Sequence, residues 1–167
     1  MNTKTILILL ILTSWQLTIA QSEGHHNHDD PDHVHHDHHR NEIGIANSPV
    51  YFVKEKELAY GLHVHYLYYF KESRFGIGLG YERIFDQHKH NTFGIVGSYR
   101  LSDGWSVNVS PGITYEDEES SEKNFALHLE STYEFEFNNF HIGPVLEFAY
   151  DPEDYHISLG LHIGFGF

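Results

Sequence analysis

Hydrophobic and polar residues alternate without a break through the last thirteen residues of the chain, Tyr155–Phe167. The odd-numbered positions are all apolar or aromatic, and the even-numbered positions are histidine, serine or glycine. Because successive side chains of a strand point to opposite faces, this pattern predicts one long strand with a bulky face and a small, polar face. Such a strand is long enough to cross a bilayer, which takes roughly 9–11 tilted residues.

The same two-residue period recurs upstream and predicts eight antiparallel strands in all. The seven further strands are expected at Glu42–Val53, Leu58–Phe70, Arg74–Phe85, Asn91–Leu101, Trp105–Tyr115, Lys123–Phe137 and Phe140–Tyr150. Asn47-Ser48-Pro49 interrupts the alternation of the first strand, so a bulge or an early bend is expected there. An even number of amphipathic strands favours an all-β fold, an up-and-down antiparallel barrel.

The predicted connections alternate between short and long ones. Lys71–Ser73, Ser102–Gly104 and Asn138-Asn139 are short, and we expect a positive φ at Gly104 and at the asparagine pair. The other connections are longer and charged, and the most acidic is Glu116–Glu122. Membrane barrels show this asymmetry, with short periplasmic turns and longer external loops, so both ends of the barrel sequence are expected on the periplasmic side.

The bulky and the polar strand faces are compatible with two architectures, a soluble barrel and a transmembrane barrel. In a soluble, lipocalin-like carrier the bulky face forms the core and the polar face meets water. The polar face is rich in glycine, however, which weakens an exposed strand but suits the narrow interior of an eight-stranded barrel. Aromatic residues also gather near strand ends, as in interfacial girdles. These residues are Phe75, Trp105, Tyr115, Phe137, Phe140, Tyr150 and Tyr155. The pattern therefore favours a transmembrane barrel.

The first forty residues differ from the rest of the chain. Met1–Ala20 combines a lysine, the apolar run Ile6–Leu12 and a small-residue cleavage motif, the three parts of a secretory signal peptide. Gln21–Arg40 has almost no residue that could enter a core, so we expect a disordered tail. The expected division is a signal peptide at 1–20, a tail at 21–40 and a barrel at 41–167. No later segment has the roughly 20 apolar residues of a membrane helix, so strands must make any membrane contact.

Net charge and cysteine content limit which ligands and partners the chain can bind. The formal net charge is −14, and a chain this acidic repels the phosphates of nucleic acid, so no nucleic-acid partner is expected. The chain has no cysteine, which excludes disulfides and thiolate metal sites. Soluble cations are more compatible partners for an acidic, exported chain than nucleic acid is.

The tail carries the strongest chemical signal. Imidazole is the commonest ligand of Zn, Cu and Ni ions, and carboxylates supplement it. The predicted tail ligands are His25, His26, His28, His33, His35, His36, His38, His39, Asp29, Asp30, Asp32 and Asp37. On a flexible chain they form several exchanging sites, which release metal as histidine protonates near its ordinary pKa of about 6.5. A hydrophilic spacer without a metal role is the alternative.

The small faces of the strands predict further ligands inside the barrel. With alternating strand directions, one group falls in the half of the lumen away from the periplasm: His63, His65, Glu82, His128, Glu130, Glu147 and His156. Nearer the periplasm fall Arg100, Glu134, Glu136 and His141, and His162 also points inward. The first group is a candidate cation site. A hydrogen-bonded polar plug is the alternative, because small barrel interiors are packed with such networks.

These features resemble a known class. The signal peptide, the eight amphipathic strands and the final Gly-Phe-Gly-Phe are similar to the small outer-membrane β-barrels of Gram-negative bacteria, of the OmpA/OmpW/OmpX type. With its His-rich tail and short loops, the chain looks more like barrels of Bacteroidota. Phe167, with apolar residues at alternate positions before it, resembles the signal that the barrel-assembly machinery recognises. The resemblance implies an outer-membrane location with the tail in the periplasm, and lipid and the assembly machinery as partners.

The sequence therefore predicts a small outer-membrane barrel whose tail binds Zn, Cu or Ni ions, for metal handling or sensing, with no cofactor required. A structural or adhesion-type barrel without a metal role is the alternative. A lipid-modifying enzyme using Asp86, His88 and His90 is less favoured, because no serine nucleophile is placed beside them, and no enzymatic activity is expected. A free-diffusion pore is not expected either, since eight strands leave little open lumen.

Overall fold

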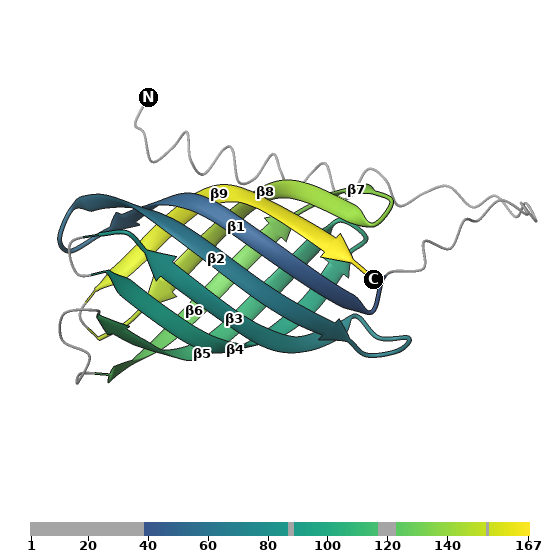
Figure 1. Cartoon of the computed structure of the whole chain (residues 1–167), viewed down its shortest axis with the longest axis horizontal. Helices are drawn as coiled ribbons and strands as arrows, with labels where there is room; N and C mark the ends of the chain where they lie inside the picture. Colours follow the sequence, from purple (N-terminus) through teal and green to yellow (C-terminus); the bar gives the residue numbers. More distant parts are fainter. Residues whose placement is uncertain (1–38, 87–88, 117–122, 153) are drawn as a thin grey trace, which may run out of the picture. The chain divides into compact units, whose positions relative to one another are not determined.

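Antiparallel β-strands make up most of the described chain (Figure 1). The computed structural model describes residues 39–86, 89–116, 123–152 and 154–167. The predicted signal peptide, residues 21–38 of the predicted tail, His88 and residues 117–122 of the acidic loop lie outside these ranges. Within them, no helix has the length and apolar character needed to cross a membrane. The strands are β1 (Asn41–Phe52), β2 (Glu57–Tyr69), β3 (Phe75–Ile84), β4 (His90–Ser102), β5 (Trp105–Glu116), β6 (Lys123–Tyr133), β7 (Phe135–Phe137), β8 (Phe140–Tyr150) and β9 (Tyr155–Gly166).

The sheet closes on itself. Its strand order is β6-β5-β4-β3-β2-β1-β9-β8-β7, and β6 also pairs with β8. β6 and β7 keep one register against β8, with Thr132 opposite Val145 and Phe135 opposite Ile142. They are therefore two parts of the single strand that the sequence predicts at Lys123–Phe137. The result is an eight-stranded antiparallel barrel, as predicted from the alternation.

Three prolines mark gaps in the hydrogen-bonded ladders. Pairing lapses for Pro49 towards β9, for Pro111 towards β4 and for Pro144 towards β6 and β7, and the register is unchanged across each gap. Proline lacks the N–H that one of its two neighbouring strands requires, so only one ladder is interrupted. The bulge or bend expected at Asn47-Ser48-Pro49 is therefore wrong, because β1 pairs without interruption along β2.

The bulky side chains point outward. Leu79, Phe93 and Leu159 are each more than half exposed, whereas the inward positions between them are glycine, serine, histidine or glutamate. A continuous apolar surface around a barrel is stable against lipid tails and unstable against water. The fold is therefore a transmembrane barrel, and a soluble carrier with a bulky core is excluded.

The two ends of the barrel differ. At the end that we call the terminus end, Asn41 N–H donates to the carbonyl of Phe167 (3.0 Å). At the opposite end, the loop end, β1, β3, β5 and β8 finish and β2, β4, β6 and β9 begin. The predicted contrast in connection length is incomplete, because residues 70–74 join β2 to β3 at the terminus end and only residues 53–56 join β1 to β2 at the loop end. Exposed aromatic side chains ring the terminus end, as the sequence predicts. They include Phe75, Trp105, Phe137 and Phe140.

The short turns differ in how they bend. Asn138 has a φ of 57°, which agrees with the expected hairpin turn. Gly104 has no positive φ, so that expectation is wrong. A Cβ at this position would instead lie 2.7 Å from the carbonyl oxygen of Glu134, so close approach of two backbones accounts for the glycine.

Side chains pack the barrel interior. Two apolar clusters are buried there. One consists of Val50, Phe52 and Ile84, and the other of Leu67, Tyr69 and Val96. The Arg100 guanidinium lies 3.5 Å from the centre of the Tyr69 ring, and the Tyr69 hydroxyl hydrogen-bonds Ser98 (3.0 Å). Other inward positions carry the histidines and carboxylates that form the candidate site.

Candidate metal centre

Strand alternation places the ionisable side chains of several strands inside the barrel. The buried ones are Glu42, His65, Glu82, His128, Glu130, His141, Glu147, His156 and His162. Each occupies an inward position between bulky outward neighbours, and the closed sheet turns all these positions towards a common lumen. Burial of so many ionisable groups is costly unless they pair with one another or bind an ion.

Four of the predicted ligands meet near the loop end. This loop-end cluster consists of Glu82 (β3), His128 (β6), Glu147 (β8) and His156 (β9), whose ligand atoms all lie within 4.8 Å of one another. His128 Nδ1 donates to Glu147 Oε1 at 2.5 Å and lies 3.5 Å from Glu82 Oε2. His156 Nε2 lies 3.9 Å from the same Glu82 oxygen. All four side chains are buried, so water cannot easily screen them.

His156 is the least satisfied member of the cluster. Its side chain is buried, yet neither ring nitrogen makes a hydrogen bond within the described chain, and Glu82 Oε2 makes none either. The Phe52 ring packs edge-on against the imidazole, with 5.2 Å between centroids, and holds it in place. Buried polar atoms without a partner are rare and call for an explanation such as an ion or an ordered water.

Two further predicted ligands lie beside this cluster. His63 Nδ1 lies 3.3 Å from Glu130 Oε2, and these residues form a second group of potential ligands with Glu147. The other oxygen of Glu130 accepts hydrogen bonds from Asn108 (2.8 Å) and Thr132 (3.3 Å). Glu130 is thus mainly engaged with protein donors, as the polar-plug alternative requires.

His65 does not join the loop-end group with which the sequence placed it. Its Nε2 lies 3.3 Å from Glu42 Oε1, and its ring stacks on His162, with 5.2 Å between centroids. His63 and His65 share the inward face of β2, but two residues along a strand are enough to move His65 into the terminus-end part of the lumen.

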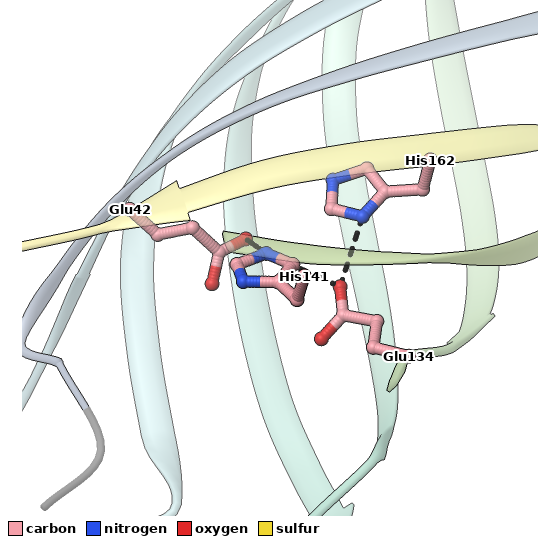
Figure 2. Close-up of side chains that lie close together, drawn as sticks. All are labelled: Glu42, Glu134, His141 and His162. Atoms are coloured by element: carbon pink, nitrogen blue, oxygen red, sulfur yellow. Dashed lines mark ion pairs between the residues drawn. The ribbon is translucent and has the colours of Figure 1, made fainter. Parts of the chain in front are cut away.

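The structure also assembles a cluster that the predicted ligand set omits. Glu42, Glu134, His141 and His162 lie together at the terminus end of the barrel (Figure 2), and their ligand atoms are again within 4.8 Å of one another. The alternation of Glu42 and Gly44 with the outward-facing Ile43 and Ile45 is the signal that could have found Glu42.

A third set of charged residues lies at the loop end, outside both clusters. Asp86 Oδ2 accepts a hydrogen bond from His90 Nδ1 at 2.7 Å, and His90 Nε2 lies 3.5 Å from Glu116. Burial opposes ionisation of Asp86, but the hydrogen bond and charge of His90 outweigh it and lower the pKa of Asp86 to about 2. Both ring nitrogens of His90 therefore face carboxylates, which suits an ion pair rather than activation of a nucleophile.

Most of the predicted tail ligands lie outside the described residues. These are His25, His26, His28, His33, His35, His36, His38, Asp29, Asp30, Asp32 and Asp37. His39 is described, and its side chain lies against the inward side of Gly166, where an added Cβ would approach it to 2.6 Å. The last tail histidine thus lies beside the residue that pairs with Glu42 across β1 and β9.

Both clusters have the composition of transition-metal sites. Imidazole and carboxylate ligands suit Zn, Cu and Ni. Ligand atoms about 2.0–2.1 Å from a tetrahedral zinc ion are roughly 3.3–3.4 Å apart. The separations between neighbouring ligand atoms in the loop-end cluster, 2.5, 3.5 and 3.9 Å, bracket this value. Small side-chain movements would therefore suffice to bind an ion.

Known structures share this architecture. The structure is similar to Neisserial surface protein A (TM-score 0.57, 10% identity, 76% of this chain and 96% of that chain). It is also similar to Ail, the attachment invasion locus protein of Yersinia pestis, in complex with the heparin analogue sucrose octasulfate (0.54, 14%, 76% and 97%). A third is the N-terminal β-barrel domain of Pseudomonas aeruginosa OprF (0.52, 18%, 77% and 99%).

At these identities the likeness shows a shared fold, that of small eight-stranded outer-membrane barrels such as the OmpA/OmpX type, and no more. No protein-family model and no curated protein sequence matches the chain. The expected likeness to barrels of Bacteroidota is not tested by these structures.

Proposed function

We propose that this protein is an outer-membrane barrel that binds transition-metal ions, Zn, Cu or Ni, at the loop-end cluster within its lumen. The observation that carries this proposal is His156, a buried imidazole that makes no hydrogen bond to any described residue and is placed among Glu82, His128 and Glu147. Metal coordination satisfies its nitrogen and neutralises carboxylates that are otherwise buried at a cost. In this role the protein handles or senses metal and has no enzymatic activity.

The His-rich tail fits the same role. Its histidines and aspartates are ligands of the same classes as those of the lumen, and the tail is joined to the barrel at His39 and Arg40. Its exchanging sites collect ions in the periplasm, and the barrel holds them in a more ordered site. Lipid and the barrel-assembly machinery are the further partners that this location requires.

A structural or adhesion-type barrel is the second candidate. It draws support from the fold shared with Ail, whose structure contains a sulfated heparin analogue. The chemistry of this chain is unfavourable for such a ligand, because its net charge is −14 and one of its loops has the sequence EDEESSE. Carboxylates repel sulfates and attract cations, so metal binding is the better supported function.

Metal titration of the full chain tests the proposal. The protein is purified from the outer membrane with its eight tail histidines replaced by asparagine, so that only barrel sites are measured. We expect tight zinc binding by calorimetry, with affinity at the loop-end cluster reduced at least about tenfold by His156→Ala or His128→Ala. His90→Gln is the matched control, since it removes an imidazole from the same end of the barrel but outside the cluster, and it leaves zinc affinity unchanged.

A folded, tail-substituted protein that binds no Zn, Cu or Ni at micromolar concentration would contradict the proposal. The contribution of the tail is read from the difference in the number of bound ions between the native and the tail-substituted protein. Equal numbers would show that the tail is a spacer.

A further inference from the structure

The terminus-end cluster is built from four separate segments of the barrel. Glu42 comes from β1, His141 from β8, His162 from β9, and Glu134 from the junction between β6 and β7. Figure 2 shows the two carboxylates and the two imidazoles directed towards one another across the lumen. Glu134, His141 and His162 come from consecutive strands, and the pairing of β1 with β9, which closes the barrel, adds Glu42 to them.

The distances between its ligand atoms are close to those of a metal site. His162 Nδ1 lies 2.9 Å and His141 Nε2 lies 3.5 Å from the same oxygen, Oε1 of Glu134. His141 Nε2 also lies 3.5 Å from Oε1 of Glu42. These separations are close to the roughly 3.3–3.4 Å between neighbouring ligands of a tetrahedral zinc ion.

His162 has no hydrogen bond despite complete burial. Its side chain is 1% exposed, and neither Nδ1 nor Nε2 has a hydrogen-bond partner within the described chain, because the short contact with Glu134 lacks hydrogen-bond geometry. The ring is stacked between His65 and His141, at centroid distances of 5.2 and 5.4 Å. Stacking fixes the imidazole plane, so Nδ1 is held towards the carboxylate.

Glu134 lies where the hydrogen-bonded pairing of β6 and β7 with β8 lapses. The hydrogen-bonded ladder lapses between β6 and β7 opposite Gly143 and Pro144, since proline has no N–H to offer. The Glu134 N–H donates to the carbonyl of Gly104, at 2.6 Å, which continues the pairing of β5 with β6. Because the register against β8 is unchanged across the lapse, Glu134 keeps the inward position that strand alternation gives it.

The charged residues beside the cluster do not occupy all of its ligand atoms, so the cluster can still bind a cation. One oxygen of Glu42, Oε2, lies 3.9 Å from Arg100 Nη2, and Oε1 faces His65 and His141. The Arg100 guanidinium lies over the Tyr69 ring. His39 lies beside Gly166, the cross-strand partner of Glu42, so the cluster is the part of the barrel nearest to the tail along the chain.

We infer that the terminus-end cluster is a second binding site, for one divalent transition-metal ion of the zinc type. Glu134 Oε1, His141 Nε2 and His162 Nδ1 are its ligands, and Glu42 Oε1 completes the set. The site is additional to the loop-end site and does not depend on it.

Cobalt titration of the tail-substituted full chain counts the two sites separately. Co²⁺ bound by imidazole and carboxylate ligands absorbs visible light, and the absorbance reports the number of ions bound. We expect two equivalents in the parent protein and one in either His162→Ala or His156→Ala. The double variant should bind none. His90→Gln is the matched control, because it removes an imidazole that lies outside both clusters, and it retains both equivalents.

Each result bears on one proposal. If His162→Ala leaves the number of ions unchanged while His156→Ala removes one, the terminus-end site is overturned and the loop-end site stands. The reverse pattern supports the terminus-end site and overturns the loop-end one. A His90→Gln protein that loses an equivalent overturns the assignment of the counted ions to the two clusters.

Correct folding is verified by the slower migration of the heated protein compared with the unheated one on electrophoresis. If His162→Ala does not fold, Glu134→Gln and His141→Gln replace it, and each is expected to remove the same equivalent. Retention of two equivalents in both of these folded variants would overturn the second site.

Discussion

Glu130 of β6 and Glu147 of β8 lie directly opposite each other across the strand pair, with both carboxylates buried in the lumen. Like charges in this position destabilise a sheet. His63, at 3.3 Å from Glu130, and His128, at 2.5 Å from Glu147, offset the repulsion. Since Glu147 also belongs to the loop-end cluster, an ion bound there reduces the repulsion further. If the proposed loop-end site binds an ion, we therefore expect metal to stabilise the barrel.

The Glu82→Gln substitution should affect barrel stability and metal affinity differently. Glu82 Oε2 is buried and accepts no hydrogen bond from the part of the chain that the structure describes, so removing its charge should leave the metal-free unfolding free energy unchanged or raise it by about 1 kcal/mol. The same change removes a ligand oxygen, so zinc affinity falls about tenfold or more. Urea unfolding of the metal-free protein and zinc calorimetry measure the two effects. Glu55→Gln, which removes an exposed carboxylate at the loop end, should alter neither.

Gly164→Ala tests how tightly the terminus-end cluster is packed. A Cβ at Gly164 would lie 1.7 Å from His141 Nε2, so the imidazole must move and the barrel loses about 1–3 kcal/mol of stability. Gly97→Ala is the control, because its Cβ meets only the Val109 carbonyl at 3.8 Å. Unfolding in detergent micelles compares the two. Equal stability of the two variants would show that the lumen around His141 is loosely packed.

Substituting arginine for an outward-facing leucine tests how deep that position lies in the membrane. Leu79 lies midway along β3 and is 65% exposed, so Leu79→Arg places a charge in the bilayer centre and costs about 2–4 kcal/mol. Leu58 is 70% exposed but lies at the loop-end start of β2, where Leu58→Arg costs about 0–1 kcal/mol. Equilibrium unfolding in phospholipid vesicles measures both. Similar costs at the two positions would contradict the assigned span.

Acid should weaken the loop end through Asp86. The pKa of Asp86 is lowered to about 2 in the folded protein by its hydrogen bond with His90, against an ordinary value of about 3.9. Its stabilising contribution is therefore complete above pH 4 and is lost as the pH falls towards 2. Asp86→Asn should lose about 1 kcal/mol at neutral pH and little at pH 2. Unfolding measured at both pH values gives the difference, and a pH-independent loss would argue against ionisation as the cause.

Local alternation was sufficient to predict the strands and the direction of their faces. The bounds of Phe140–Tyr150 agree with β8, and the outward exposure of Leu159 agrees with the pattern in the last strand. A two-residue period is a local property, and in a barrel this narrow the interior accepts only small or polar side chains at most positions. Inside and outside therefore follow from the sequence. The break at Pro49 misled the prediction because proline affects only one of its two ladders.

Which inward residues meet was decided only by the tertiary structure. Glu82 of β3 approaches His156 of β9 across the lumen, and Glu42 of β1 approaches His141 of β8, although neither pair lies on adjacent strands. Such contacts depend on the stagger between strands and on closure of the sheet, which alternation along one strand does not specify. His63 and His65, identical in residue type and face, accordingly belong to different parts of the lumen.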